Sequence, residues 1–339
     1  MTIVGGFDVH RQQITFDYID TDSGEERRGK ITPATRQRLR SWLNDLPSTS
    51  GAFALEGCTG WRFVTEELRA VGMDAHVAEP ADTAALRGPK KRAKTDQLDA
   101  RHLRELLQAA SIPESWIPPV HVLEARCRVR LYKTLVDQRT SWRQRIQAQL
   151  FHHGVPVIAG LLTVEGRTRL ATADVSPAAR EVLDVALCMI DAINAQLQPL
   201  HAEIVGFARH QPGCRALMAH YGIGSLTAVA IWAELGDCRR FSSSADAVRH
   251  TGLDITVHSS DSKRGRGRLA RQGPPVLRWA LFEAAKCAAR PHAPDHPYYQ
   301  TTRDRLGATR ATLSVARKLA RRCHHSLRNL DDQVFAPAA

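Results

Sequence analysis

The first 78 residues alternate short apolar stretches with polar turns, and this order constrains the fold more than any other part of the chain. Strands are expected at 3–9, 13–19, 27–31, 51–55 and 74–78, and helices at 35–46 and 61–71. The polar cluster at 20–24 is a turn signal between the second and third strands. Three strands joined by hairpins, then helix, strand, helix and strand, predict a mixed sheet flanked by helices.

An acidic helix is expected next. Residues 94–100 read KTDQLDA and open an amphipathic run that continues to Leu107. In a helix, Asp96 and Asp99 lie on one face because residues three apart are neighbours there. Adjacent carboxylates repel each other unless a cation lies between them, so the pair indicates a divalent metal site. The alternative is an ordinary helix start, with Thr95 as N-cap and both acids in the first turn.

A cationic segment stands directly before these acids, since residues 87–94 read RGPKKRAK. A site that handles phosphate polyanions with Mg²⁺ requires cations beside its carboxylates. Four residues of the segment are therefore candidates for binding nucleic acid: Lys90, Lys91, Arg92 and Lys94.

Two further acids stand where predicted central strands end. Asp8 lies near the end of the first strand, and Glu56 follows the fourth. Sites are common at the ends of neighbouring strands in α/β sheets, and a buried carboxylate there is costly unless it is paired or metal-bound. With Asp96 and Asp99 they would make four acids around one or two Mg²⁺ ions, with Mn²⁺ as a substitute. Taken singly, each also fits an ordinary surface acid.

The composition indicates a polyanionic partner, because the net charge is +12 and the pI is near 9.8. No apolar run approaches the roughly 20 residues that cross a bilayer. The first six residues lack the basic start and long apolar core of a signal peptide, so we expect a cytoplasmic protein with no membrane partner. The seven cysteines include no Cys-x-x-Cys pair, which argues for reduced thiols and against a zinc site.

The character of the chain changes after residue 111. A proline-rich connection at 112–120 leads into two long helical patterns, 121–152 and 177–207, with a turn region expected at 154–174. Such a pair predicts a helical hairpin or coiled coil that is available for self-association. The first pattern is dense in arginine, which fits either a solvated face or a surface that binds nucleic acid. We expect three regions: 1–111, 112–210 and 211–339.

The last region contains a glycine turn, a serine cluster and basic helices. Residues 222–228 read GIGSLTA, resemble a helix-hairpin-helix element and open a helix through Leu235. Further helices are expected at 244–250, 273–289 and 309–328. The serines at 259–262 stand beside four cations that are candidates for binding nucleic acid: Lys263, Arg264, Arg266 and Arg268. A hydroxyl attacks a phosphodiester poorly unless its proton is removed and the new charge is compensated. The alternative is a loop that only touches phosphates.

Several motifs resemble the DEDD transposases of the insertion-sequence one-hundred-and-ten family: GFDVH, LEGCTGW, KTDQLDA, GDCRRF, AVRHTGL and RGRLARQGPPVLRWALFEAA. The resemblance implies a RuvC-like domain of the ribonuclease H fold over 1–111, a helical oligomerisation region over 112–210 and a transposase domain over 211–339. It implies the metal-binding tetrad Asp8, Glu56, Asp96 and Asp99. It also implies a serine nucleophile after Gly252-Leu253, which falls on Ser260.

This sequence departs from the family around that serine. Ile255 stands where a proline is usual, Asp261 stands where a glycine is usual, and Ser259 adds a second hydroxyl. Ser260 remains the expected nucleophile, with Ser259 in reserve. The family's partners would be donor and target DNA, a structured bridge RNA that pairs with both, and copies of the chain in a dimer or tetramer.

Three other interpretations remain open. A Holliday-junction resolvase or related nuclease would use the four acids to activate water and leave ends with no protein attached. A sugar-kinase or actin-like ATPase would share the three early strands and Asp8, but it requires glycine-rich phosphate loops. A non-catalytic architectural DNA-binding protein would keep all of its activity without Asp8.

Overall fold

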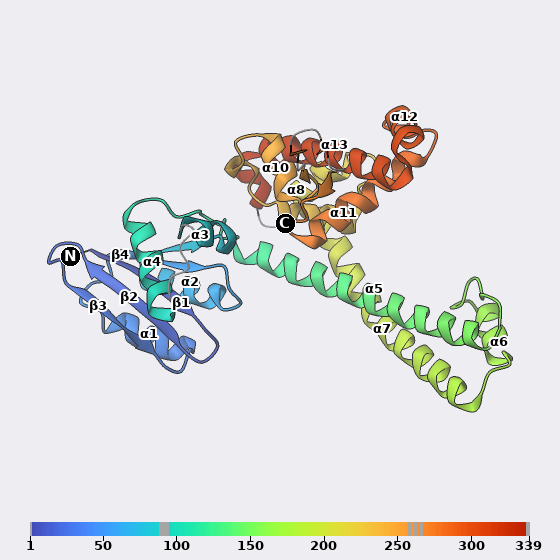
Figure 1. Ribbon diagram of the computed structural model, residues 1–339, viewed down its shortest axis with the longest axis horizontal. Helices are drawn as coiled ribbons and strands as arrows, with labels where there is room; N and C mark the ends of the chain where they lie inside the picture. The colour runs from blue at the N-terminus through green and yellow to red at the C-terminus, as the bar shows by residue number, and fades with distance from the viewer. Residues whose placement is uncertain (1, 88–94, 257–258, 261–262, 265–266, 337–339) are drawn as a thin grey trace. The chain divides into compact units, whose positions relative to one another are not determined.

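The computed structural model describes residues 2–87, 95–256, 259–260, 263–264 and 267–336 (Figure 1). The chain divides into two compact units, Met1–Ile117 and Pro118–Ala339. Each unit has a hydrophobic core of its own. The predicted regions 112–210 and 211–339 therefore lie largely within one unit, and the division of labour among three regions stays a prediction.

The first unit is built on the predicted mixed sheet, with strand order β3-β2-β1-β4-β5. Its strands are β1 (Ile3–Val9), β2 (Ile14–Asp20), β3 (Glu26–Ile31), β4 (Gly51–Glu56) and β5 (Asp74–Ala78). The first three pair antiparallel as a meander, whereas β4 is parallel to β1 and β5 is parallel to β4. The central strand β1 therefore has one antiparallel and one parallel neighbour.

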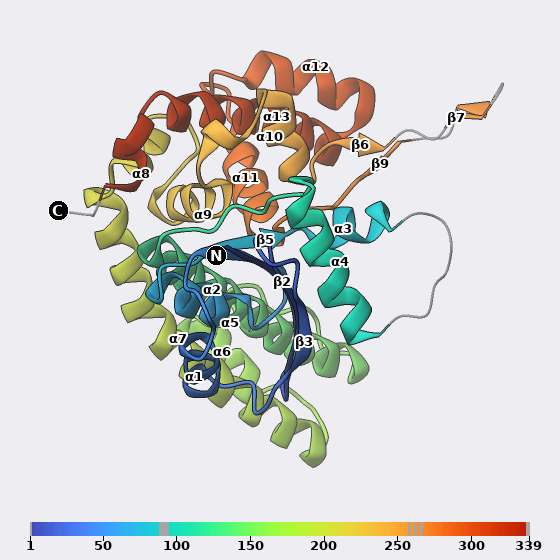
Figure 2. The same cartoon turned by 90° about the vertical axis from the view of Figure 1, so that its left-hand side faces the viewer.

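Helices cover both faces of this sheet (Figure 2). They are α1 (Arg36–Asn44), α2 (Trp61–Ala70), α3 (Pro80–Leu86) and α4 (Asp96–Gln108). Because side chains alternate along a strand, Phe7 and Phe53 point to the face that α1 and α2 cover, and their rings stack 4.4 Å apart. Ala54 points the other way and packs with Leu103 of α4.

A glycine lets α4 approach the central strand closely. A Cβ at Gly6 of β1 would lie 2.0 Å from the carbonyl oxygen of Ala100 and 2.7 Å from the backbone nitrogen of Arg104. Real side-chain atoms do not come so close, so this position requires glycine for steric reasons alone.

Buried charges also hold α4 on the sheet. Arg104 of α4 lies 3.0 Å from Asp17 of β2 and 2.9 Å from Glu26 of β3. Burial raises the pKa of the Asp17 carboxyl, and the guanidinium of Arg104 opposes that rise. These two contacts hold α4 over β2 and β3. Arg104 stands eight residues after Asp96, the first acid of the helix.

Two long helices open the second unit, α5 (Val120–His152) and α7 (Pro177–His210), and they pack against each other. The connection between them, expected to be a turn region, contains a further helix, α6 (Val164–Ala171). The core between these helices consists of buried aliphatic side chains, including Ile146, Leu150, Leu183, Ala186 and Ile190.

The remaining α-helices are α8 (Pro212–Met218), α9 (Ser225–Leu235), α10 (Ser244–His250), α11 (Pro275–Lys286), α12 (His296–Leu306) and α13 (Ala308–Arg328). Of these, α8, α11 and α13 pack against α9, and α10 and α12 pack against α13. Residues 228–235 of α9 are all buried, and Trp232 donates a hydrogen bond of 2.8 Å to the carbonyl of Val334 near the end of the described chain. Glu234 accepts two hydrogen bonds from Arg130, which ties α9 to α5.

The sequence predicted most of these elements but not all of them. The bounds of β1, β5 and α10 match the predictions, and the other predicted elements differ from the structure only near their ends. Among the α-helices that the structure describes, α3, α6, α8 and α12 were not predicted. Among the helices that the structure describes, none combines the length and apolar character that crossing a membrane requires.

Candidate functional site

Two of the predicted acids leave the sheet on the same face. In the parallel pairing of β1 with β4, Phe7 stands beside Leu55, so the next residues are Asp8 and Glu56. Phe7 and Leu55 point into the core with α1 and α2. By the alternation of a strand, Asp8 and Glu56 point to the opposite face, where α4 packs. Strand register therefore brings these two carboxylates to one edge of the sheet.

The first turn of α4 adds a third acid, and the turn after β1 adds a histidine. His10 Nε2 lies 3.0 Å from Asp8 Oδ2 and 3.7 Å from Asp96 Oδ1. One potential ligand atom from each of these three residues lies within 4.8 Å of the others. Gln13, at the start of the β2 side of the turn, donates a hydrogen bond of 2.9 Å to Asp96 Oδ2 and orients that carboxylate.

The fourth acid is neutralised by an arginine. Arg87, the residue after α3, donates a hydrogen bond from Nη1 to Asp99 Oδ1, and its Nη2 lies 3.9 Å from Glu56 Oε1. Two of the predicted ligands, Asp8 and Asp96, therefore meet at His10, and the other two, Asp99 and Glu56, meet at Arg87. The sequence analysis singled out neither His10 nor Arg87, although GFDVH and RGPKKRAK contain them.

Electrostatics around Asp8 fit a cation site. Burial raises the pKa of the Asp8 carboxyl, His10 opposes the rise, and the charges of Asp96 and Asp99 add to it. A cation among these groups would replace that repulsion by attraction. Clustered carboxylate oxygens suit a hard divalent ion such as Mg²⁺ or Mn²⁺, and an imidazole nitrogen broadens the choice toward transition metals.

The two interpretations of the acidic helix are compatible. Thr95 is the N-cap of α4, and its side chain accepts a hydrogen bond of 3.3 Å from the backbone nitrogen of Leu98. Asp96 and Asp99 lie in the first turn, as an ordinary helix start requires. Capping fixes the direction in which both acids leave the helix, so it supports the site rather than replacing it.

The predicted cations before α4 lie outside the described residues: Lys90, Lys91, Arg92 and Lys94. In the second unit, Arg266 also lies outside them. Arg268 is exposed in β9 (Arg268–Leu269), which pairs with β6 (Ile255–Thr256).

The backbone places Ser260 within a hairpin of the second unit. β7 (Ser259–Ser260) pairs antiparallel with β8 (Lys263–Arg264), so Ser260 stands opposite Lys263. β7 lies beyond β6 and β9, away from the helices of the second unit (Figure 2).

The base of that hairpin is firmly anchored. Arg278 of α11 donates a hydrogen bond of 3.2 Å to the carbonyl of Thr251, and Arg317 of α13 donates one of 2.6 Å to the carbonyl of Leu253. Between these carbonyls, Gly252 has a φ of 68°, which favours glycine. The AVRHTGL and RGRLARQGPPVLRWALFEAA segments are thus joined where the serine hairpin begins.

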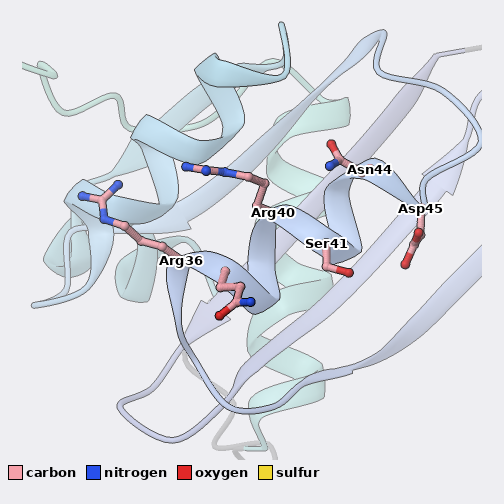
Figure 3. Close-up of a pocket in the computed structure, with 6 residues that line it drawn as sticks. Arg36, Arg40, Ser41, Asn44 and Asp45 are labelled. Carbon is pink, nitrogen blue, oxygen red and sulfur yellow. The ribbon is translucent and has the colours of Figure 1, made fainter.

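A polar hollow on α1 is not part of this site (Figure 3). It is lined by Arg36, Gln37, Arg40, Ser41, Asn44 and Asp45. Its two guanidinium groups are already paired with acids of α2, since Arg36 contacts Glu66 and Arg40 contacts Glu67. α1 also covers the face of the sheet opposite α4. We therefore assign it no role in the chemistry.

Comparison with known proteins gives two family models that match parts of this chain. A DEDD transposase model of the IS110 type matches residues 5–153, and a model described as "Transposase IS116/IS110/IS902 family" matches residues 214–300. The first match contains the four acids, and the second contains Ser260.

Three transposases illustrate the similarity. The chain is 25% identical to a probable family 20 transposase of Pseudomonas aeruginosa over 272 residues, which is 75% of each protein. It is 22% identical to the transposase for insertion sequence element IS1111A of Coxiella burnetii over 307 residues, 88% of this chain and 83% of that one. It is 23% identical to the transposase for insertion sequence element IS1328 of Yersinia enterocolitica over 244 residues, 69% of each.

The mixed sheet, the carboxylates at its edge and these matches define a DNA transposase with a ribonuclease H-like amino-terminal domain. Such an enzyme rearranges the DNA of a mobile element and typically uses a divalent metal ion. The chain belongs to the IS110 family of transposases.

Proposed function

We propose that this transposase cleaves and rejoins DNA strands with a serine nucleophile, beside Mg²⁺ held at the edge of a RuvC-like sheet. The observation that carries the proposal is the convergence of Asp8, His10 and Asp96 within 4.8 Å, at the end of the central strand. These three residues come from a strand, a turn and a helix. Their convergence fits a cation site better than it fits unrelated surface acids.

Asp8, Glu56, Asp96 and Asp99 would hold the metal, with Mg²⁺ as the natural ion and Mn²⁺ as its substitute. The ion would supply positive charge against the scissile phosphate. Gln13 keeps Asp96 in place, and the fold of α4 over Gly6 keeps both acids of the helix beside β1. The cations predicted at 90–94 and 263–268 would contact the phosphates of the nucleic acid.

Ser260 would carry out the covalent step. Its Oγ forms a bond to phosphorus as the bond between phosphorus and a sugar oxygen of the strand breaks. The hydroxyl proton passes to solvent, and the released sugar oxygen takes up a proton. Attack by a sugar hydroxyl on the phosphoserine reverses these changes and rejoins the strand, so no ATP is required. Ser259 is the alternative nucleophile.

The partners would be donor DNA, target DNA and a structured bridge RNA whose loops pair with both. Base pairing would then select the sequence, while the protein supplies chemistry and recognises shape, as in other RNA-guided systems. The net charge of +12 fits such cargo. A homo-oligomer, dimer or tetramer, would form through the 112–210 region. Val182, Val185 and Met189 support this because they are exposed on one side of α7.

The test is the recovery of a covalent adduct under denaturing conditions, with labelled DNA that carries the element's ends and its guide RNA. The wild type and Ser259→Ala should form the adduct, whereas Ser260→Ala and Asp8→Asn should not. An undiminished adduct from Ser260→Ala would refute the nucleophile. Cleaved ends without any adduct in the wild type would instead favour a resolvase-like nuclease that uses metal-activated water.

A further inference from the structure

Arg87 lies beside two acids of the tetrad, and the proposed function gives this arginine no role. It is the first residue after α3 and the first residue of the cationic segment 87–94. A hydrogen bond from Thr83 to the carbonyl of Glu79 stabilises α3, and His102 of α4 lies 3.4 Å from the carbonyl of Thr83. The contact between α3 and α4 therefore positions the Arg87 guanidinium beside the carboxylates.

The contacts of Arg87 are those of a cation placed between two acids. It bonds to Asp99, which is almost fully buried, and it lies 3.9 Å from Glu56. A buried carboxylate requires a compensating charge, and a guanidinium supplies one when no metal is bound. The Asp99 oxygen that accepts this bond is an oxygen that a metal ion would need, so the guanidinium and the ion compete for it.

The remaining donors of Arg87 leave it able to take another partner. Its Nε is buried and makes no hydrogen bond to any residue within the described ranges. A guanidinium has five donors in a fork that matches phosphate oxygens as well as carboxylates. If a metal ion took its carboxylates, the phosphate of a bound strand would offer this guanidinium a suitable partner.

Resting on the proposed function, we propose that Arg87 is an exchangeable placeholder in the metal site. In the metal-free protein it holds Asp99 and Glu56. When a divalent ion binds, Arg87 leaves these carboxylates and binds the DNA phosphate beside the scissile bond. The residue thereby couples loading of the metal to binding of the substrate, because the same guanidinium serves the two states in turn.

Mn²⁺ binding to the full-length protein without nucleic acid provides the first test, measured by titration calorimetry and by electron paramagnetic resonance. Removal of a competitor strengthens binding, so Arg87→Ala should bind Mn²⁺ about tenfold more tightly than the wild type, within the range typical of coupled sites. Arg87→Gln, which keeps most of the side-chain volume, should behave alike and replaces Arg87→Ala if that variant fails to fold. Arg101→Ala, which removes a surface pair with Glu105, is the matched control.

The second test uses DNA at saturating Mn²⁺. Arg87→Ala and Arg87→Gln should bind the metal yet cleave the strand at least tenfold more slowly, and Arg87→Lys should recover part of the rate. Unchanged or weaker Mn²⁺ affinity in both neutral variants would overturn the placeholder, and full cleavage by them would overturn the contact with phosphate. Asp8→Asn separates these failures from failure of the site, because persistent Mn²⁺ binding in that variant would refute the proposed metal centre itself.

Discussion

Arg104 Nε of α4 lies 3.0 Å from Asp17 Oδ1 of β2, and both side chains are almost wholly buried. This pair differs from surface salt bridges, which contribute little to stability, because each of its charges has lost most of its water. Its geometry holds the helix that carries Asp96 and Asp99 against the sheet that carries Asp8. The pair therefore acts on the candidate site without touching it.

Breaking this pair should destabilise the first unit. Arg104→Leu leaves Asp17 buried without its partner, so we expect the free energy of unfolding to fall by about 3–5 kcal/mol. Urea unfolding followed by tryptophan fluorescence measures the change. Arg101→Ala, on the exposed side of the same helix, should leave the unfolding midpoint nearly unchanged. Equal effects of the two variants would show that the buried pair has no special role.

Loss of the hydrogen bond to Asp96 should weaken metal binding. Gln13→Ala removes the donor that orients this carboxylate, and losses of such supporting contacts typically cost 10- to 100-fold in metal affinity. We expect a fall of about tenfold in Mn²⁺ affinity with little change in folding. Gln12→Ala, an exposed neighbour, is the control. If both variants bound Mn²⁺ like the wild type, Asp96 would not depend on Gln13.

The second unit should lose stability in mild acid because of His250. Burial, together with the charge of Arg240, lowers the pKa of this histidine to about 4. The unfolded chain takes up a proton near pH 6.5, whereas the folded protein does not until about pH 4. Stability is therefore present above pH 6.5 and falls as the pH drops from there to about 4, by up to about 1.4 kcal/mol for each pH unit.

His250→Gln should remove that component of the pH dependence, which urea midpoints at pH 7.5 and pH 5 would reveal. The exposed His152 provides the control, since His152→Gln should keep the slope of the wild type. A slope that survives in His250→Gln would assign the acid sensitivity to other groups.

The link between α5 and α9 should depend on Glu234. This buried carboxylate binds Arg130 and lies 3.6 Å from Arg126, whose pKa burial lowers to about 10. Glu234→Leu leaves the buried Arg126 without this counter-charge, so we expect a loss of about 3–5 kcal/mol. Hydrogen exchange should show faster opening of both helices. Asp137→Ala, which breaks only a surface pair on α5, should leave their protection unchanged.

Hydrophobic periodicity predicted the elements whose own residues show a clear apolar pattern. Alternation and apolar runs fixed β1, β4 and β5, and long amphipathic patterns fixed α4, α5 and α13, since both patterns depend on residues close in sequence. α6 has only Gly166 and Leu170 buried, and α12 has only Tyr299 and Thr302. Short helices of this kind are stabilised by packing on distant segments, which sequence periodicity does not reveal.

The residues of the candidate site also fall into those that local sequence predicts and those that it does not. Asp8 and Glu56 could be predicted because a strand determines where its last side chain points. His10 could not, since its approach to Asp96 depends on the turn after β1 and on the placement of a helix 86 residues later. The sequence indicated only that the cationic segment starting at Arg87 stands before the acids; the packing of α3 beside α4 directs the Arg87 guanidinium to Asp99. The roles of these residues stay predictions until they are measured.

The missing side chain at Gly6 sets how closely the two halves of the candidate site can approach each other. One added methyl group there would act as a wedge between strand and helix, because it would meet the carbonyl of Ala100 at 2.0 Å. α4 would have to move away from β1. Asp96 and Asp99 would then be carried away from Asp8, although none of these residues had been replaced. The spacing of the candidate acids is thus set by the clearance between two backbones, and a loss of that clearance would separate them without replacing any of them.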